Sequence, residues 1–136
     1  MKYLDEVAKC GRDANPFFRM MGIEIVEYGK GVARLSMQVR PDMHNGVGWL
    51  QGGIFVALAD EAMALALYTV LSEGEGIATI SENTSFFKGI QKGTVVATGK
   101  VIRKGRRIAF TEGEVLTSDG EVLLSRTSAS FAVTNT

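Results

Sequence analysis

The stretch from Ile54 to Leu71, IFVALADEAMALALYTVL, has the composition of a helix that is apolar on almost every side. Such a helix has to be enclosed by other structure. Its many alanines allow a sheet or a second helix to approach closely, and they lie at positions 57, 59, 62, 64 and 66. The same stretch carries two adjacent acids, Asp60 and Glu61. An ionised carboxylate in apolar surroundings costs several kcal/mol unless it is paired, hydrogen-bonded or wetted, so these acids need an explanation.

Two explanations for the acids are open at the level of residues. In the first, one acid reaches solvent at an edge of the helix and the other forms an ion pair. In the second, one acid is a general base or nucleophile that faces a cleft. Neighbouring residues point about 100° apart on a helix, so spacing alone does not choose between Asp60 and Glu61.

The segments on either side of this helix predict an antiparallel sheet of about six strands. Alternation and turn residues place strands at 22–28, 32–40, 78–87, 94–103, 108–116 and 121–133. Gly29-Lys30-Gly31 is a predicted turn, Gly74-Glu75-Gly76 a predicted break, and Asp119-Gly120 predicts a two-residue type I′ turn.

The predicted architecture is α+β, with the sheet packed against one long helix over residues 53–71. A short N-terminal surface helix is expected over residues 1–15, ending at Asn15-Pro16. The chain of 136 residues, 46% hydrophobic, suits a single domain over 1–136. One helix leaves part of such a sheet uncovered, so we expect at least a dimer.

Charge and cysteine content exclude several classes of protein. Fifteen basic and fifteen acidic residues cancel, so no overall field attracts nucleic acid or an anionic membrane. Cys10 is the single cysteine, no segment resembles a signal peptide, and no apolar run reaches the roughly 18 residues of a membrane span. We therefore expect a soluble cytoplasmic protein. One histidine and one cysteine make no ligand cluster, so no metal is expected.

Gln51-Gly52-Gly53 directly precedes the apolar helix. Glycines at a helix N-terminus let a ligand approach unpaired backbone N–H groups, although paired glycines are also common in ordinary loops. Gly52 and Asp60 are eight residues apart, about 12 Å along one helix, so they cannot both act on one small carbonyl group. Two antiparallel helices from two subunits can bring them together. If both residues are catalytic, the active site has to be shared.

The pattern Asn45-x-x-Gly48-x-x-Gln51-Gly52-Gly53, followed by Leu58-Ala59-Asp60-x-Ala62, resembles the signature of hotdog-fold acyl-CoA thioesterases of the phenylacetate-degradation (PaaI-like) type. The segments 79–86 and 101–123 are similar as well, and the resemblance covers residues 18–133. It implies a hotdog fold, in which the sheet wraps around the central helix. It also implies dimers that join their sheets and commonly pair into tetramers.

The resemblance also implies roles for individual residues. Asp60 would be the general base or nucleophile, and Gly52 would offer its backbone N–H to the thioester carbonyl. Asn45 would polarise or position the carbonyl or the attacking water, and Thr79 would hold that water together with the acid. No cofactor is implied beyond the CoA of the substrate itself.

One position departs from the family pattern. Gln51 stands where the family usually has histidine, and glutamine can hydrogen-bond but cannot titrate near neutral pH. The only histidine, His44, lies seven positions earlier and is expected to be a loop residue at the rim of the cleft. The glutamine leaves the Gly52 amide intact, but the loss of a titratable group at this position affects the expected rate of hydrolysis.

The candidate substrate-binding residues lie near the helix start and in two basic turns. Gly53 belongs to the glycine pair at the helix start. Lys88 and Lys92 flank one turn, and Arg103, Lys104, Arg106 and Arg107 form another. These are either solvated hairpins or the binding site for the CoA phosphates. Apolar residues that line the acyl pocket or belong to the core are Trp49, Phe55, Met63, Tyr68, Phe86 and Phe87. An aryl or a medium-chain acyl group would suit them.

Three functions remain open from the sequence. The first is hydrolysis of acyl-CoA thioesters by a dimer or tetramer. The second is non-catalytic binding of acyl-CoA on the same fold, which Gln51 makes more credible. The third is a hydratase or dehydratase, which would need a histidine–acid pair placed for proton transfer.

Overall fold

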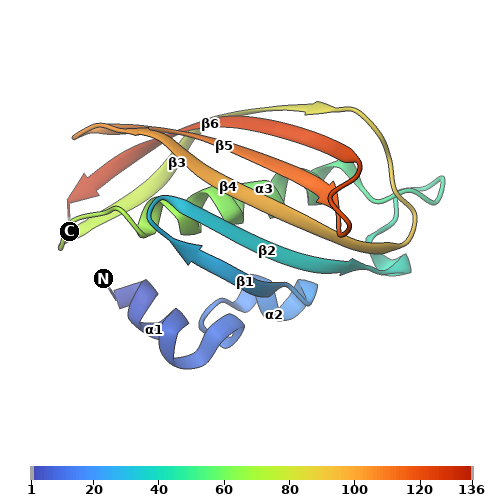
Figure 1. The fold of residues 1–136 in the computed structure, drawn as a ribbon, viewed down its shortest axis with the longest axis horizontal. Coiled ribbons are helices and arrows are strands. Elements are labelled where there is room, and N and C mark those ends of the chain that lie inside the picture. The colour runs from blue at the N-terminus through green and yellow to red at the C-terminus, as the bar shows by residue number, and fades with distance from the viewer. Residues whose placement is uncertain (1, 136) are drawn as a thin grey trace.

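A computed structural model describes residues 2–135, which form one antiparallel sheet against a long helix (Figure 1). The helix α3 (Gly52–Tyr68) lies along one face of the sheet. The strand order is β1-β2-β4-β5-β6-β3. The strands are β1 (Glu24–Gly29), β2 (Val32–Val39), β3 (Glu75–Phe86), β4 (Gly93–Lys104), β5 (Ile108–Thr117) and β6 (Leu123–Asn135). The predicted α+β class and the six strands are confirmed.

The N-terminal segment differs from the prediction. Helix α1 (Lys2–Cys10) gives way to a 3₁₀ turn η1 (Gly11–Ala14), and a further helix, α2 (Pro16–Met21), follows; Met1 lies outside the described residues. Asn15 therefore begins a helix as well as ending one. Its Oδ1 accepts hydrogen bonds from the backbone N–H groups of Phe17 and Phe18 at 3.0 and 3.4 Å, and Pro16 takes the first helical position.

Two turns show how glycine positions decide strand pairing. Lys30 and Gly31 both have positive φ, 53° and 79°, and join the paired residues Gly29 and Val32, which makes this the type I′ hairpin. The type I′ prediction at Asp119-Gly120 is wrong, because only Gly120 has positive φ there. Its N–H instead donates to the Thr117 carbonyl at 2.8 Å in a longer loop.

Two predicted boundaries in the middle of the chain move. Helix α3 ends at Tyr68 rather than at residue 71. The predicted break at Gly74-Glu75-Gly76 is confirmed at Gly74, which has a positive φ of 83°, but it ends earlier than predicted, because β3 already begins at Glu75 and pairs there with Asn135 of β6. An ion pair between Lys104 Nζ and Glu75 Oε1, 3.1 Å long, holds this strand start against the end of β4.

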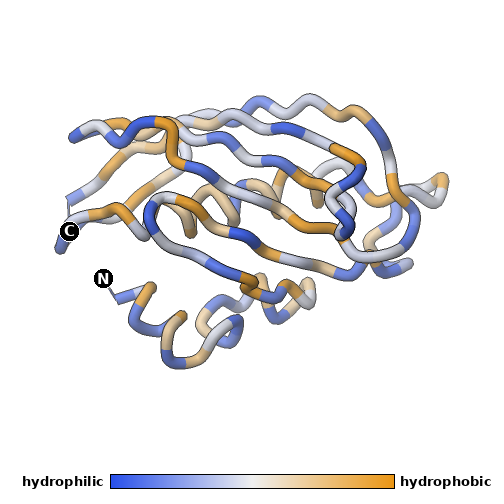
Figure 2. Tube along the Cα trace, viewed as in Figure 1, coloured by the Kyte–Doolittle hydropathy of each residue, from blue (hydrophilic) through white to orange (hydrophobic). Residues whose placement is uncertain are grey.

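Helix α3 approaches the sheet very closely. A Cβ on Gly99 of β4 would lie 2.3 Å from the backbone carbon of Ala62, and one on Gly113 of β5 would lie 3.3 Å from the Cβ of Ala59. Ala59 and Ala62 are fully buried. The expectation that the alanines admit a neighbouring sheet is confirmed. Figure 2 shows the matching alternation of apolar and polar residues along the strands.

The opposite side of α3 is only partly covered. Its residues there are small or polar: Gly53, Ala57, Asp60, Glu61 and Ala64, followed by Tyr68. Beside this strip, β3 forms one edge of the sheet over 12 residues.

None of the helices in residues 2–135 combines the length and hydropathy needed to cross a bilayer.

We predict that Gly99→Ala lowers the free energy of unfolding by about 3 kcal/mol, because the added methyl group would overlap the α3 backbone. Urea denaturation followed by circular dichroism measures the change. Gly53→Ala is the matched control, since a Cβ there meets open space. Equal stability of Gly99→Ala and the wild type would contradict the close packing described.

Candidate active site

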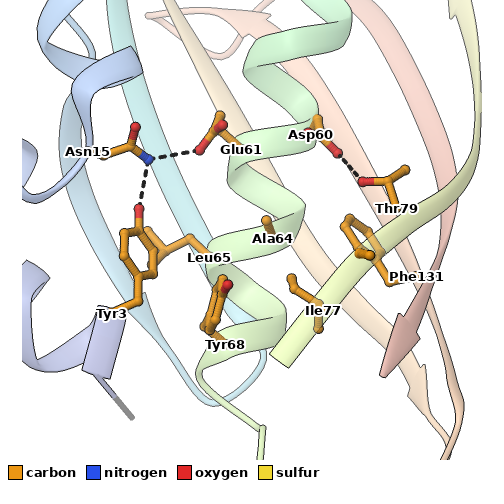
Figure 3. Close-up of a pocket in the computed structure, with 11 residues that line it drawn as sticks. Tyr3, Asn15, Asp60, Glu61, Ala64, Leu65, Tyr68, Ile77, Thr79 and Phe131 are labelled. Carbon is orange, nitrogen blue, oxygen red and sulfur yellow. Dashed lines mark hydrogen bonds between the residues drawn. The ribbon is translucent and has the colours of Figure 1, made fainter. Parts of the chain in front are cut away.

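Asp60 is half-buried on α3 and faces the beginning of β3. The Thr79 hydroxyl donates a hydrogen bond to Asp60 Oδ1 at 3.3 Å (Figure 3). Both residues border a cavity of about 300 Å³, called the Asp60 cavity from here on. It is lined by Tyr3, Asn15, Asp60, Glu61, Ala64, Leu65, Tyr68, Ile77, Ala78, Thr79 and Phe131. The structure thus brings together two of the predicted site residues.

Glu61 points to the other side of α3, toward the N-terminal segment (Figure 3). Its Oε1 accepts a hydrogen bond from Asn15 Nδ2 at 3.0 Å, and the same amide donates to the Tyr3 hydroxyl at 2.8 Å. Within residues 2–135, Glu61 forms no ion pair, and its hydrogen-bond partner Asn15 is neutral. Burial raises the pKa of Glu61 above its ordinary value, the Asn15 hydrogen bond partly opposes that rise, and the charge of Asp60 adds to it.

A third carboxyl group, which the sequence reasoning missed, belongs to this site. Glu82 on β3 has one carboxyl oxygen, Oε1, fully buried with no hydrogen-bond donor beside it. Its pKa is raised to about 8, first by burial and then by the hydrogen bond and the charge of Asp60. Simple alternation from Thr79 would have placed Glu82 on the opposite face of the strand, so no pattern pointed to it.

The start of α3 presents two free donors. The backbone N–H groups of Gly52 and Gly53 have no acceptor among residues 2–135. Gln51, the residue before the helix, is exposed, and its side chain makes no capping bond. Gly52 lies in ordinary contact with the Phe86 ring, 3.7 Å from where a Cβ would be.

The loop before α3 uses the side chain of Asn45 to hold its own shape. Asn45 Oδ1 accepts from the backbone N–H groups of Val47 and Trp49 at 3.0 and 3.1 Å. The amide Nδ2 is therefore the part of Asn45 left for a substrate. His44 Nε2 donates to the backbone carbonyl of Gln91 at 2.7 Å, which ties this loop to the segment after β3.

Gly52 and Asp60 are not brought together within one chain. Both lie in α3, eight residues and about 12 Å apart along its axis. Asp60 has Thr79 and Glu82 as neighbours, whereas Gly52 belongs with Asn45 and the loop. Each chain thus holds two separate groups of site residues.

The candidate acyl-pocket residues are scattered. Phe55 and Met63 are buried in the core, and Phe86 packs edge-on against Phe55 with ring centroids 5.9 Å apart. Trp49 and Phe87 are exposed. Tyr68 is the member of this set that lines the Asp60 cavity, where it lies 5.0 Å from the ring of Tyr3. Tyr3 and Asn15 were missed, because the N-terminal helix was interpreted as a surface element.

The two basic turns lie at opposite ends of the sheet. Lys88 and Lys92 lie in the segment that touches the loop before α3, where the Leu50 N–H donates to the Ile90 carbonyl at 2.9 Å. The other turn, residues 103–107, lies at the far end of β4 (Figure 1). At roughly 3.3 Å per residue, the length of β4 separates the two turns by about 35 Å. Arg103, Arg106 and Arg107 are exposed there, whereas Lys104 is paired with Glu75.

A helix packed against a six-stranded antiparallel sheet is the arrangement of hotdog-fold thioesterases. The family model of the thioesterase superfamily matches residues 48–124, more than half of the chain. The chain therefore belongs to the thioesterase superfamily, with a hotdog fold of the PaaI-like type.

Individual relatives agree with this assignment. The chain is 30% identical over 113 residues to 1,4-dihydroxy-2-naphthoyl-CoA hydrolase of Listeria monocytogenes, covering 83% of this chain and 91% of the relative. It is 29% identical over 110 residues to acyl-coenzyme A thioesterase 13 of Homo sapiens, covering 79% and 78%. Among solved structures, a mutant of the phenylacetic acid degradation protein PaaI from Thermus thermophilus matches with a TM-score of 0.78 and 27% identity, over 87% of this chain and 98% of that one. The general activity is thioester hydrolysis.

Proposed function

We propose that the protein hydrolyses acyl-CoA thioesters with Asp60 as general base or nucleophile. The observation that carries this proposal is the Asp60 carboxylate beside the Thr79 hydroxyl, bordering a cavity on the uncovered side of α3. A carboxylate at a cavity can take a proton from water or attack a carbonyl carbon, and a neighbouring hydroxyl can hold that water.

The proposed site is shared between two subunits. Gly52 and Asp60 are about 12 Å apart in one chain, so one substrate carbonyl can meet both only if the second residue comes from another copy. The strip of small residues on α3 allows a second helix to lie close and antiparallel. The exposed edge β3 offers the backbone groups for joining two sheets. A homodimer, or a tetramer made of two such dimers, follows from the same contacts.

The chemistry then divides between two helix positions. The Gly52 N–H, at the positive end of α3, stabilises the oxyanion that forms on the thioester carbonyl, which is worth a few kcal/mol. Asn45 Nδ2 is the second donor, because its Oδ1 is occupied within the loop. Asp60 of the other subunit activates water or forms a mixed anhydride. Gln51 contributes at most a hydrogen bond.

The acyl group occupies the Asp60 cavity. Its walls mix polar and apolar groups, with Tyr3 and Tyr68 on one side and Ile77 and Phe131 on the other (Figure 3). A volume of about 300 Å³ suits an aryl group or a medium-length chain. The Listeria relative is named for an aryl-CoA substrate, which supports the aryl choice.

CoA phosphates are bound by basic residues from both ends of the sheet. In an antiparallel dimer, the turn of Arg103, Arg106 and Arg107 in one subunit approaches the loop of Lys88, Lys92 and Gly53 in the other. Lys104 contributes less, since its charge is paired with Glu75. A hydratase is disfavoured, because His44 is bound to the Gln91 carbonyl and makes no contact with Asp60.

We predict that Asp60→Asn lowers kcat for acyl-CoA hydrolysis at least about 100-fold, equivalent to some 2.7 kcal/mol of barrier. Release of free CoA is measured across short, medium, long and aryl acyl-CoAs, with the thiol of Cys10 subtracted. Glu61→Gln is the matched control and should keep its activity, since a glutamine oxygen still accepts from Asn15. Tight binding of acyl-CoA without turnover by the wild type would instead support a non-catalytic binding protein.

We predict that replacing Arg106 and Arg107 together by alanine raises KM for CoA esters about 10-fold or more, because contacts to phosphate are lost. Turnover of a truncated thioester without the nucleotide should stay unchanged. Arg19→Ala, at an exposed arginine on α2, controls for overall charge. Equal effects on both substrates would argue against contact with phosphate.

A further inference from the structure

An irregularity in β3 turns Glu82 toward Asp60. Thr79 pairs with Phe131 of β6 and Ser81 with Ser130, so Ile80 is an extra residue in the ladder. Without this bulge, residues three apart would point to opposite faces. With it, Thr79 and Glu82 pair with Phe131 and Ala129, which are both buried on the side of α3. The bulge places the hydroxyl and the carboxyl group on one face.

The contact between Glu82 and Asp60 needs a proton. The bulge turns Glu82 to the α3 side of the sheet, close enough for the charge of Asp60 to raise its pKa, and Glu82 Oε1 is fully buried without a donor. Ionised carboxylates only accept hydrogen bonds, so two of them in contact repel each other. One shared proton turns this repulsion into a hydrogen bond.

The surroundings supply no positive charge that would replace this proton. Helix α3 presents Asp60, with Glu61 one residue further, and β3 presents Thr79. On β6 the facing residues are the apolar Ala129 and Phe131. In residues 2–135, no lysine, arginine or histidine forms an ion pair with Asp60 or Glu82.

We infer that Glu82 is a positioning residue that keeps a proton and donates a hydrogen bond to the Asp60 carboxylate. With the Thr79 hydroxyl as a second donor, Asp60 is then held in one orientation with a free oxygen lone pair toward the cavity. This role rests on the proposed function, because orientation of Asp60 matters only if Asp60 does the chemistry. The shared proton itself does not depend on the reaction.

The raised pKa of Glu82 gives the pair a definite pH dependence. Its pKa is about 8 in the folded protein and ordinarily about 4.5, so the folded state holds this proton more tightly. The stability from the pair is fully present below about pH 4.5 and is lost as the pH rises to about 8. Above that pH, Glu82 is ionised and Asp60 loses its donor.

The first test needs no substrate. In the full-length protein labelled with ¹³C at the glutamate carboxyl groups, one resonance should titrate near pH 8 and be missing in Glu82→Gln. In Asp60→Asn, its midpoint should fall toward 4.5, because the partner's charge is gone. A Glu82 midpoint near 4.5 in the wild type, or one that ignores Asp60→Asn, would overturn the shared proton.

The second test separates positioning from folding. Wild-type kcat should fall above about pH 8, whereas Glu82→Gln, whose amide still donates but cannot ionise, should stay active through that range. Glu82→Ala should lose about 10-fold in kcat, some 1.4 kcal/mol, with KM unchanged. Identical pH profiles for wild type and Glu82→Gln would overturn the positioning role. A resonance that titrates near pH 8 in a protein without thioester turnover would support the pair and refute the proposed function.

Discussion

The rest of the structure depends on the contact between α3 and the sheet. Gly99 and Gly113 carry no side chain at the point where the helix crosses β4 and β5, so the alanines of α3 rest almost directly on the sheet. A helix this apolar is stable because the sheet encloses most of its surface. One strip remains uncovered, and Asp60 and Glu61 lie on it. The same contact therefore explains the apolar composition of the helix and the place of its acids.

Three carboxyl groups gather beside this strip, and none of them forms an ion pair with a lysine, arginine or histidine of residues 2–135. Each is accommodated differently: Glu61 accepts from Asn15, Asp60 accepts from Thr79, and Glu82 in our proposal keeps its proton. Burying an ion pair at this place would have left a fixed positive charge next to Asp60, the carboxylate that we propose to react. Neutral donors orient the acid and leave its negative charge available.

The sequence predicts the layers of the fold well, because the long apolar run of the helix and the alternation of apolar and polar residues in the strands are both visible in the chain. It also predicts that Thr79 and Asp60 belong together, through the resemblance of their segments to one family. The prediction from sequence fails where a local irregularity sets the direction of a side chain. No sequence pattern reveals the bulge at Ile80, so Glu82 is missed. Asn15-Pro16 carried a readable signal, since asparagine followed by proline also starts helices. Tyr3 reaches the cavity only through tertiary packing.

We propose that each active site takes Gly52 from one subunit and Asp60 from another, so mixing two inactive variants should restore activity. Asp60→Asn removes the acid. Gly52→Pro removes the N–H at the first helical position, where proline is tolerated. After the two variants are unfolded and refolded together, random pairing should restore about a quarter of wild-type acyl-CoA turnover, because half the dimers contain one intact site. If both variants are dimeric and the mixture stays as inactive as each alone, the active site is not shared between subunits.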